Sequence, residues 1–184
     1  IGARPTYGLA VMELAKHHKD LIVVTADVST SAGLDRFRKT YPEKFVDVGI
    51  AEQNMIGVAA GLADNGYNVF TTTFAPFQTL RCLDQIKVNL AYSNIKVTMT
   101  GLASGLINGP LGNTHCCIED IGALRSIPNL KILSPADGVG IFKAVYAAAE
   151  TGQPVYIRLT GGSKNPIVYH DDINFKIGEA IEVE

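Results

Sequence analysis

The sequence predicts an α/β protein with an open, parallel β-sheet of about six strands and helices on both faces. Short runs of β-branched and other apolar residues alternate along the chain with longer amphipathic segments, as in repeated β–α units. The strand-like runs are apolar almost throughout, which is typical of strands that are buried on both faces. At 184 residues the chain has the length of one ordinary α/β domain.

In chain order, the expected strands are 21–27 (LIVVTAD), 46–48 (VDV), 67–74 (YNVFTTTF), 95–102 (IKVTMTGL), 130–134 (LKILS) and 154–160 (PVYIRLT). Helical patterns lie at 5–18, 50–64, 76–91 and 137–151. We predict one domain over residues 1–170, followed at 171–184 by a linker or the start of a further domain, because an apolar rhythm resumes after a polar stretch. Ligand-binding residues should follow the carboxyl ends of the strands.

Composition excludes several classes of function. The 16 basic residues nearly balance the 18 acidic ones and the pI is about 6.1, so no basic surface for nucleic acid is expected. Apolar runs are interrupted well before they reach bilayer-spanning length, which predicts a soluble protein with no membrane partner. Cys82, Cys116 and Cys117 match neither a disulfide framework nor a zinc-ligand spacing, and this favours a reducing cytoplasm.

Residues 46–66 (VDVGIAEQNMIGVAAGLADNG) place Glu52 after a short strand, in the first turn of a helix that is rich in small residues. Small side chains permit close approach, so we expect this helix to be buried against another element or subunit. Taken alone, Glu52 is explained by the positive end of the helix dipole. Phe74 and Phe77, at the start of the next predicted helix, would by themselves be interpreted as core residues.

Two further segments follow predicted strands. Asp27 and Ser31 come after the first strand, where an aspartate that forms a turn or a helix cap is about as common as one that contacts a ligand. The loop at 101–120 (GLASGLINGPLGNTHCCIED) is long and rich in glycine, which is typical of a functional loop, and His115 is its candidate residue. The other histidines are expected at the surface: His17, His18 and His170.

Together these segments resemble the transketolase family. GIAEQNM preceded by VDV is similar to the signature around the pyrimidine-binding glutamate of transketolases and deoxyxylulose-phosphate synthases, and the corresponding position is Glu52. The resemblance implies a thiamine diphosphate-binding fold of the pyrimidine type, in which this carboxylate hydrogen-bonds N1′ of the cofactor's aminopyrimidine ring. A proton shared with N1′ favours the 4′-imino tautomer, whose nitrogen removes the proton from thiazolium C2, so Glu52 would tune the cofactor's own base.

The resemblance assigns roles to the other candidates as well. Phe74 and Phe77 match the aromatic pocket that stacks on the pyrimidine ring, while Leu80 stands where transketolases commonly carry a third aromatic residue. Asp27 and Ser31 match a turn near the cofactor. The histidine of the family's Gly-x-Thr-His motif, which assists proton transfer at the reacting carbons, corresponds to His115.

At several positions the chain departs from ordinary transketolases. Pro110 and Leu111 replace an acidic pair, Ala103 replaces a histidine, and Gly161 replaces an arginine. In the family the histidine and arginine hold the sugar phosphate and the acidic residue contacts a substrate hydroxyl, so the usual pentose phosphate acceptors are in question. A cation would have to come from a shifted position, namely Arg158 or Lys164.

The Gly-Asp-Gly motif with which the family binds the diphosphate and Mg²⁺ does not occur in this sequence. The resemblance therefore implies that a partner subunit or domain holds both groups and that this chain supplies no metal ligand. The expected protein is a transketolase-like subunit, active only with that partner, which moves a two-carbon ketol unit between small sugars. A homodimer or a two-plus-two assembly is expected.

Three alternatives stay open. Two are enzymes with the same cofactor, namely a deoxyxylulose-phosphate synthase-like protein and the beta-type subunit of a 2-oxoacid dehydrogenase, although beta-type subunits usually place their glutamate in a different local motif. The third is a non-catalytic regulatory subunit that retains the fold, which the lost phosphate ligands favour.

Overall fold

The computed structural model describes residues 1–161, 164–179 and 181–182. Its six strands are all parallel and form one sheet in the order β2-β1-β3-β4-β6-β5. The predicted fold class is therefore confirmed. The strands are β1 (Leu21–Thr25), β2 (Phe45–Asp47), β3 (Asn68–Phe74), β4 (Val97–Leu102), β5 (Lys131–Leu133) and β6 (Val155–Arg158).

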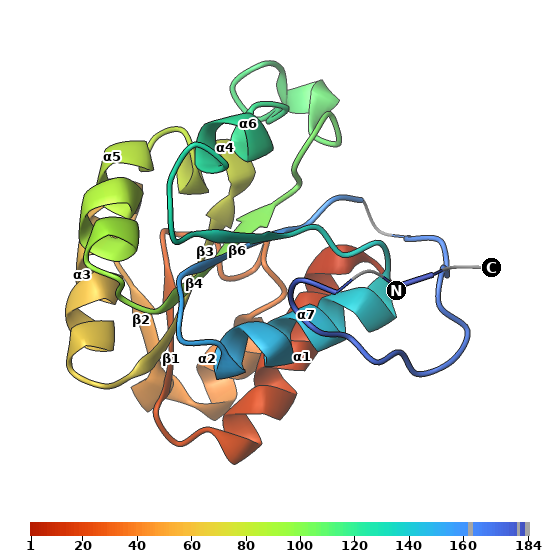
Figure 1. Ribbon diagram of the computed structural model, residues 1–184, viewed down its shortest axis with the longest axis horizontal. Helices are drawn as coiled ribbons and strands as arrows, with labels where there is room; N and C mark the ends of the chain where they lie inside the picture. The colour runs from red at the N-terminus through yellow and green to blue at the C-terminus, as the bar shows by residue number, and fades with distance from the viewer. Residues whose placement is uncertain (162–163, 180, 183–184) are drawn as a thin grey trace.

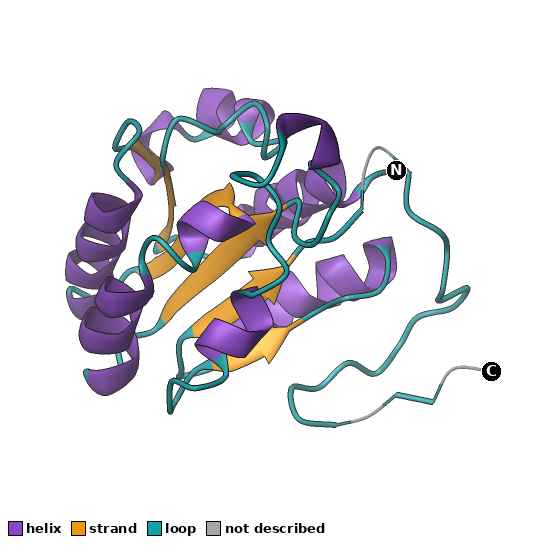
Figure 2. Ribbon diagram, turned by 90° about the horizontal axis from the view of Figure 1, so that it is seen from above, coloured by secondary structure: helices purple, strands orange, loops and turns teal. Residues whose placement is uncertain are grey.

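Helices cover both faces of the sheet, as Figure 2 shows. One face packs against α1 (Ala3–His17), α2 (Asp35–Thr40) and α7 (Gly138–Glu150), and α1 and α7 lie side by side (Figure 1). The other face packs against α3 (Glu52–Asp64), α5 (Leu83–Gln85), η2 (Ile86–Tyr92) and α6 (Asp120–Leu124). The remaining short helices are η1 (Pro42–Lys44), α4 (Ala75–Gln78) and η3 (Gly109–Leu111).

The apolar runs form strands because both of their faces are covered. In β1, Leu21 and Val23 belong to the core beneath α1 and α7, whereas Val24 belongs to the core beneath α3 and η2. Successive side chains of a strand point to opposite faces, so an uninterrupted apolar run supplies both cores at once.

The helix predicted at 76–91 is broken in the structure. After α4 the Thr79 hydroxyl donates to the Ala75 carbonyl over 2.7 Å, and the Cys82 thiol donates to the Phe77 carbonyl over 3.1 Å. Side chains that bond to backbone carbonyls compete with helix continuation, and the chain resumes only as α5 and the π-helical η2. This irregular turn sets the direction of Arg81. The short helices α2 and α6 were not predicted, because they contain too few residues to show a helical period.

The chain after β6 forms no regular element in residues 164–179 and 181–182, yet part of it is anchored. The backbone N–H groups of Val168 and Tyr169 donate to Asp137 Oδ2, and Phe175 and Ile177 pack against the core beneath α1 and α7. The domain boundary after residue 170 stays a prediction. Among the described helices, none combines the length and the apolar character that crossing a bilayer requires.

Candidate active site

The predicted site residues follow four adjacent strands at one edge of the sheet. Asp27 follows β1, Glu52 follows β2, Phe74 ends β3, and the loop with His115 follows β4. The chain passes from β1 to a neighbour on one side, β2, and then crosses to β3 on the other side. The carboxyl edge of a parallel sheet at such a reversal is where open α/β folds bind ligands.

Asp47 organises the turn that leads to Glu52. Its Oδ2 accepts from the Thr25 hydroxyl over 3.0 Å, and its Oδ1 accepts from the backbone N–H groups of Asp27 and Gly49 over 3.0 and 2.9 Å. The single carboxylate therefore ties the end of β1 to the turn after β2. Sequence reasoning missed Asp47, although an aspartate at a strand end two residues before a glycine is a turn signal that could have identified it.

Glu52 is the first residue of α3 and is only 5% exposed. Its Oε1 accepts a hydrogen bond from Arg81 Nη1 over 2.9 Å, and the Arg81 side chain is 44% exposed. Beside this pair, burial raises the pKa of the Cys82 thiol to about 12, with a smaller contribution from the negative charge of Glu52. The carboxylate is therefore largely shielded from water and open on one side. A hollow of roughly 400 Å³ lies on that side and is lined by Ile50, Ala51, Glu52, Gln53, Asn54 and Arg81.

Three rings gather near Arg81, the residue that donates to Glu52. The centroids of Phe74 and Phe77 are 6.3 Å apart, and the His115 ring lies edge-on at 5.8 Å from Phe74 and 5.2 Å from Phe77. The guanidinium carbon of Arg81 lies 4.0 Å from the centroid of Phe77. The fold therefore joins the predicted residues Glu52, Phe74, Phe77 and His115 into one cluster, with Arg81 as a member that sequence reasoning missed.

The loop that carries His115 is closed at its base. Gly105 and Cys117 exchange two backbone hydrogen bonds of 2.6 and 2.8 Å. Cys117 is buried and Cys116 is half-buried. These two bonds fix the base of the loop after β4, and they limit the positions that His115 can take.

Beneath that loop lies a buried polar cluster. Asp120 is fully buried, and its Oδ2 accepts from the Tyr156 hydroxyl over 2.9 Å and from Arg158 Nε over 2.8 Å. Burial raises the pKa of Tyr156 well above its ordinary value, and the negative charge of Asp120 adds to the effect. Because Arg158 is committed to this buried pair, it is poorly suited to replace the missing phosphate ligands, whereas Lys164 is exposed.

The remaining candidates lie apart from the cluster. Asp27 is exposed in a left-handed turn (φ 56°) and Ser31 is half-buried, and neither side chain forms a hydrogen bond within the described residues. Their proximity to a cofactor stays a prediction. His17 and His170 are exposed as expected, whereas His18 is partly buried, with its Nε2 3.2 Å from Glu150 Oε1. The described ranges bring no three His, Cys, Asp or Glu side chains close enough to hold a metal ion.

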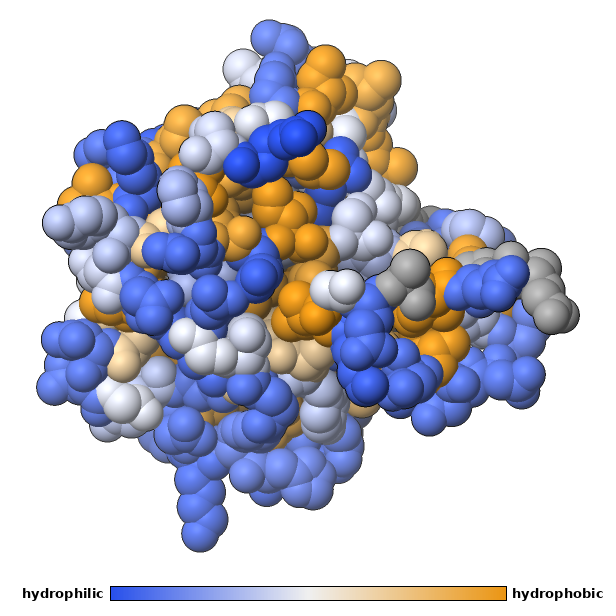
Figure 3. Space-filling view, viewed as in Figure 1, coloured by the Kyte–Doolittle hydropathy of each residue, from blue (hydrophilic) through white to orange (hydrophobic). Residues whose placement is uncertain are grey.

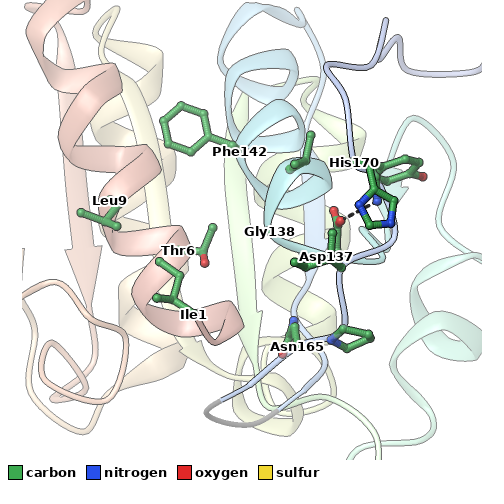
Figure 4. Close-up of a pocket in the computed structure, with 12 residues that line it drawn as sticks. Ile1, Thr6, Leu9, Asp137, Gly138, Phe142, Asn165 and His170 are labelled. Carbon is green, nitrogen blue, oxygen red and sulfur yellow. Dashed lines mark hydrogen bonds between the residues drawn. The ribbon is translucent and has the colours of Figure 1, made fainter.

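A second cavity, of about 490 Å³, lies between α1, the start of α7 and the tail (Figure 4). Thr6 and Leu9 of α1 line one side, and Phe142 of α7 lines another. The buried Asp137 caps α7 through Gly140 N–H and also accepts from two backbone N–H groups of the tail. Its oxygens are therefore already engaged, and His170 is the single histidine among the lining residues, so we assign no site there.

Comparison with known proteins gives a consistent result. Residues 1–164 match the family model described as "Transketolase, pyrimidine binding domain". The chain is 40% identical over 181 residues to one of the subunits of the apulose-4-phosphate transketolase of Phocaeicola vulgatus, covering 98% of this chain and 58% of that protein. It is 36% identical over 180 residues to the putative transketolase C-terminal section of Methanocaldococcus jannaschii, covering 97% and 57%.

Among solved structures, a split-gene transketolase described as an inactive beta4 tetramer superposes with a TM-score of 0.85 at 38% identity, covering 96% of this chain and 56% of that one. The chain thus spans little more than half the length of these relatives. The resemblance deduced from the Glu52 segment is confirmed: this chain belongs to the transketolase family and corresponds to its pyrimidine-binding domain.

Proposed function

We propose that this chain is the pyrimidine-binding part of a thiamine diphosphate-dependent transketolase, which transfers a two-carbon ketol unit from a ketose to an aldose. The observation that carries the proposal is the buried carboxylate of Glu52, which Arg81 links to the cluster of Phe74, Phe77 and His115. Family membership and the similarity to split transketolases support it.

Glu52 is proposed to bind N1′ of the aminopyrimidine and to share a proton with it. A carboxyl group can do this when it is shielded from water and still reachable from one side, and Glu52 satisfies both conditions. The residues present fit such a ring, because the flat guanidinium of Arg81 already lies over Phe77 while its N–H group bonds to Glu52. When bound, thiamine diphosphate would supply the nucleophilic carbon that takes up the ketol unit.

The three rings have complementary roles in this proposal. Phe74 and Phe77 exclude water from the pyrimidine and give it a flat apolar contact. His115 is partly buried, with its Nδ1 3.0 Å from the Thr114 hydroxyl. Its other ring nitrogen is proposed to exchange protons with the hydroxyl and carbonyl oxygens of the sugars. Asp27 and Ser31 are proposed to contact the cofactor from the end of β1.

A partner subunit or domain is proposed to bind the diphosphate and Mg²⁺, since this sequence lacks the Gly-Asp-Gly motif. Around the site, apolar side chains more than half exposed form what we call the carboxyl-edge patch: Ile50, Leu106, Leu111 and Ile118. Figure 3 shows hydrophobic residues gathered at the top of the molecule, where the loop after β4 lies. Exposed apolar residues around a half-formed site are typical of a surface that another protein covers.

Ile118→Asp, in the carboxyl-edge patch, is expected to weaken association with the diphosphate-binding partner by about tenfold or more, because a charge would be buried at the interface. Association can be measured by biolayer interferometry. The matched control is Ile167→Asp in the tail, where the residue is 72% exposed, against 66% for Ile118, but belongs to another surface. Equal effects of both changes, or none from Ile118→Asp, would exclude this patch from the interface.

The direct test combines the full-length polypeptide that carries this chain with its diphosphate-binding partner, thiamine diphosphate and Mg²⁺. Extension of an aldose by two carbons is expected from the mixture and from neither protein alone. Ketoses and aldoses with and without phosphate should be screened, because Ala103 and Gly161 stand in place of the family's phosphate ligands.

Two other results of this test would identify an alternative. Release of CO₂ from a 2-oxoacid without ketol transfer would favour a deoxyxylulose-phosphate synthase-like enzyme or a dehydrogenase. Cofactor binding by the assembled pair without turnover on any sugar or 2-oxoacid would favour the non-catalytic subunit.

A further inference from the structure

Arg81 occupies an unusual place for an arginine in this site. Its guanidinium bonds to the buried Glu52 over 2.9 Å and lies 4.0 Å above the ring of Phe77. These are two of the contacts proposed above for the cofactor's aminopyrimidine, namely a hydrogen bond to the carboxylate and a stacking contact with an aromatic ring. The guanidinium of Arg81 therefore already occupies the position that the aminopyrimidine ring would need.

The chemistry of the guanidinium explains the match. Like a protonated aminopyrimidine it is planar, delocalised and positively charged, and it presents N–H groups in its own plane. A flat donor of this kind can lie over an aromatic face and donate to a carboxylate at the same time. Lysine, with a compact ammonium group, would reach Glu52 without covering the ring.

The backbone of Arg81 is anchored, whereas its side chain can move away from Glu52. The Gln53 side-chain amide donates to the Arg81 carbonyl over 3.0 Å, so the irregular turn after α4 is tied to the first turn of α3. The Arg81 side chain, 44% exposed, lies along the open hollow beside Glu52. Only the arginine side of this pair is exposed, so water can solvate a displaced guanidinium, while an incoming ring would take over its bond to the buried Glu52.

We propose that Arg81 competes with the aminopyrimidine ring for Glu52 and Phe77, and so sets the affinity of this chain for the cofactor. The inference rests on the proposed function, since it needs the ring to bind at Glu52. Before the cofactor arrives, Arg81 keeps the buried carboxylate paired. When the ring binds, the guanidinium moves into the hollow lined by Ile50 and Asn54, where water replaces its contacts.

The test is the dissociation constant of thiamine diphosphate for the full-length protein assembled with its partner in the presence of Mg²⁺, measured by isothermal titration calorimetry. Arg81→Met keeps the length of the side chain and removes its charge and plane, and it is expected to tighten binding on the order of tenfold. Arg36→Met, at an exposed arginine of α2 on the face of the sheet opposite to α3, is the control and should leave the constant unchanged.

Unchanged or weaker binding by Arg81→Met would overturn the proposal, because Arg81 would then be neutral or would assist the cofactor. Glu52→Gln in the same experiment separates this failure from that of the proposed function. If Glu52→Gln abolishes turnover while Arg81→Met fails to tighten binding, only the competition is wrong. If Glu52→Gln changes neither binding nor turnover, the assignment of the ring to Glu52 is wrong and the competition falls with it.

Discussion

Glu52→Gln is expected to lower the turnover number for ketol transfer roughly 100- to 10,000-fold in the assembled enzyme, the range that a positioned acid–base group contributes. Glutamine has nearly the shape of glutamate and can still bond to a ring nitrogen, but it cannot share an acidic proton with N1′. The loss should therefore appear in turnover at saturating cofactor, with a smaller effect on cofactor binding. Initial rates with a ketose donor and an aldose acceptor measure it.

Glu43→Gln is the matched control for this change. Glu43 is exposed in η1, just before β2, at the end of that strand opposite to Glu52. Its neutralisation should leave turnover and thermal stability at the wild-type values. Full activity of Glu52→Gln, with normal folding confirmed by circular dichroism, would remove the acid–base role on which the proposed function rests.

Asp120→Ala is expected to destabilise the protein by about 3–5 kcal/mol, the effect of breaking a buried ion pair from one side. The change would leave Arg158, whose side chain is 15% exposed, without its carboxylate and would remove a partner of the buried Tyr156 hydroxyl. Asp120 also begins α6, directly after the loop that carries His115. Urea unfolding followed by circular dichroism gives the free energy of unfolding.

A second variant tests whether the unpaired charge is the cause. Asp120→Asn combined with Arg158→Met removes both charges and nearly keeps side-chain volume, so it should recover a large part of the lost stability. Asp64→Ala, at the exposed end of α3, is the control and should change the free energy of unfolding by less than about 0.5 kcal/mol. A double variant as unstable as Asp120→Ala would show that packing, and not charge, dominates at this position.

The sequence could predict most of the fold, because the information lies in local patterns. Continuous apolar runs marked all six strands, and the ends of α1, α3 and α7 differ from the predicted ranges by at most two residues. The short α2 and α6 escaped prediction, since five or six residues are not enough to show a period. The break after α4 escaped it too, because it depends on side-chain bonds from Thr79 and Cys82 to backbone carbonyls.

The residues of the candidate site also divide into those that a local motif identifies and those that only the tertiary structure reveals. Glu52, Phe74, Phe77 and His115 could be named from their local motifs, because each follows a strand in a recognisable segment. The sequence alone also settled that no Gly-Asp-Gly motif is present. These are properties of short stretches of chain, and no knowledge of distant contacts is required to find them.

Only the tertiary structure decided which side chains neutralise one another. Arg81 is 29 residues from Glu52, and Arg158 is 38 residues from Asp120, so neither pair has a local signal. Their meeting depends on the order β2-β1-β3-β4-β6-β5, which brings the ends of strands distant in sequence to one edge. The type of each residue determines which chemistry its side chain can perform. The path of the chain across the sheet determines which partner it meets, namely Arg81 for Glu52 and Asp120 for Arg158.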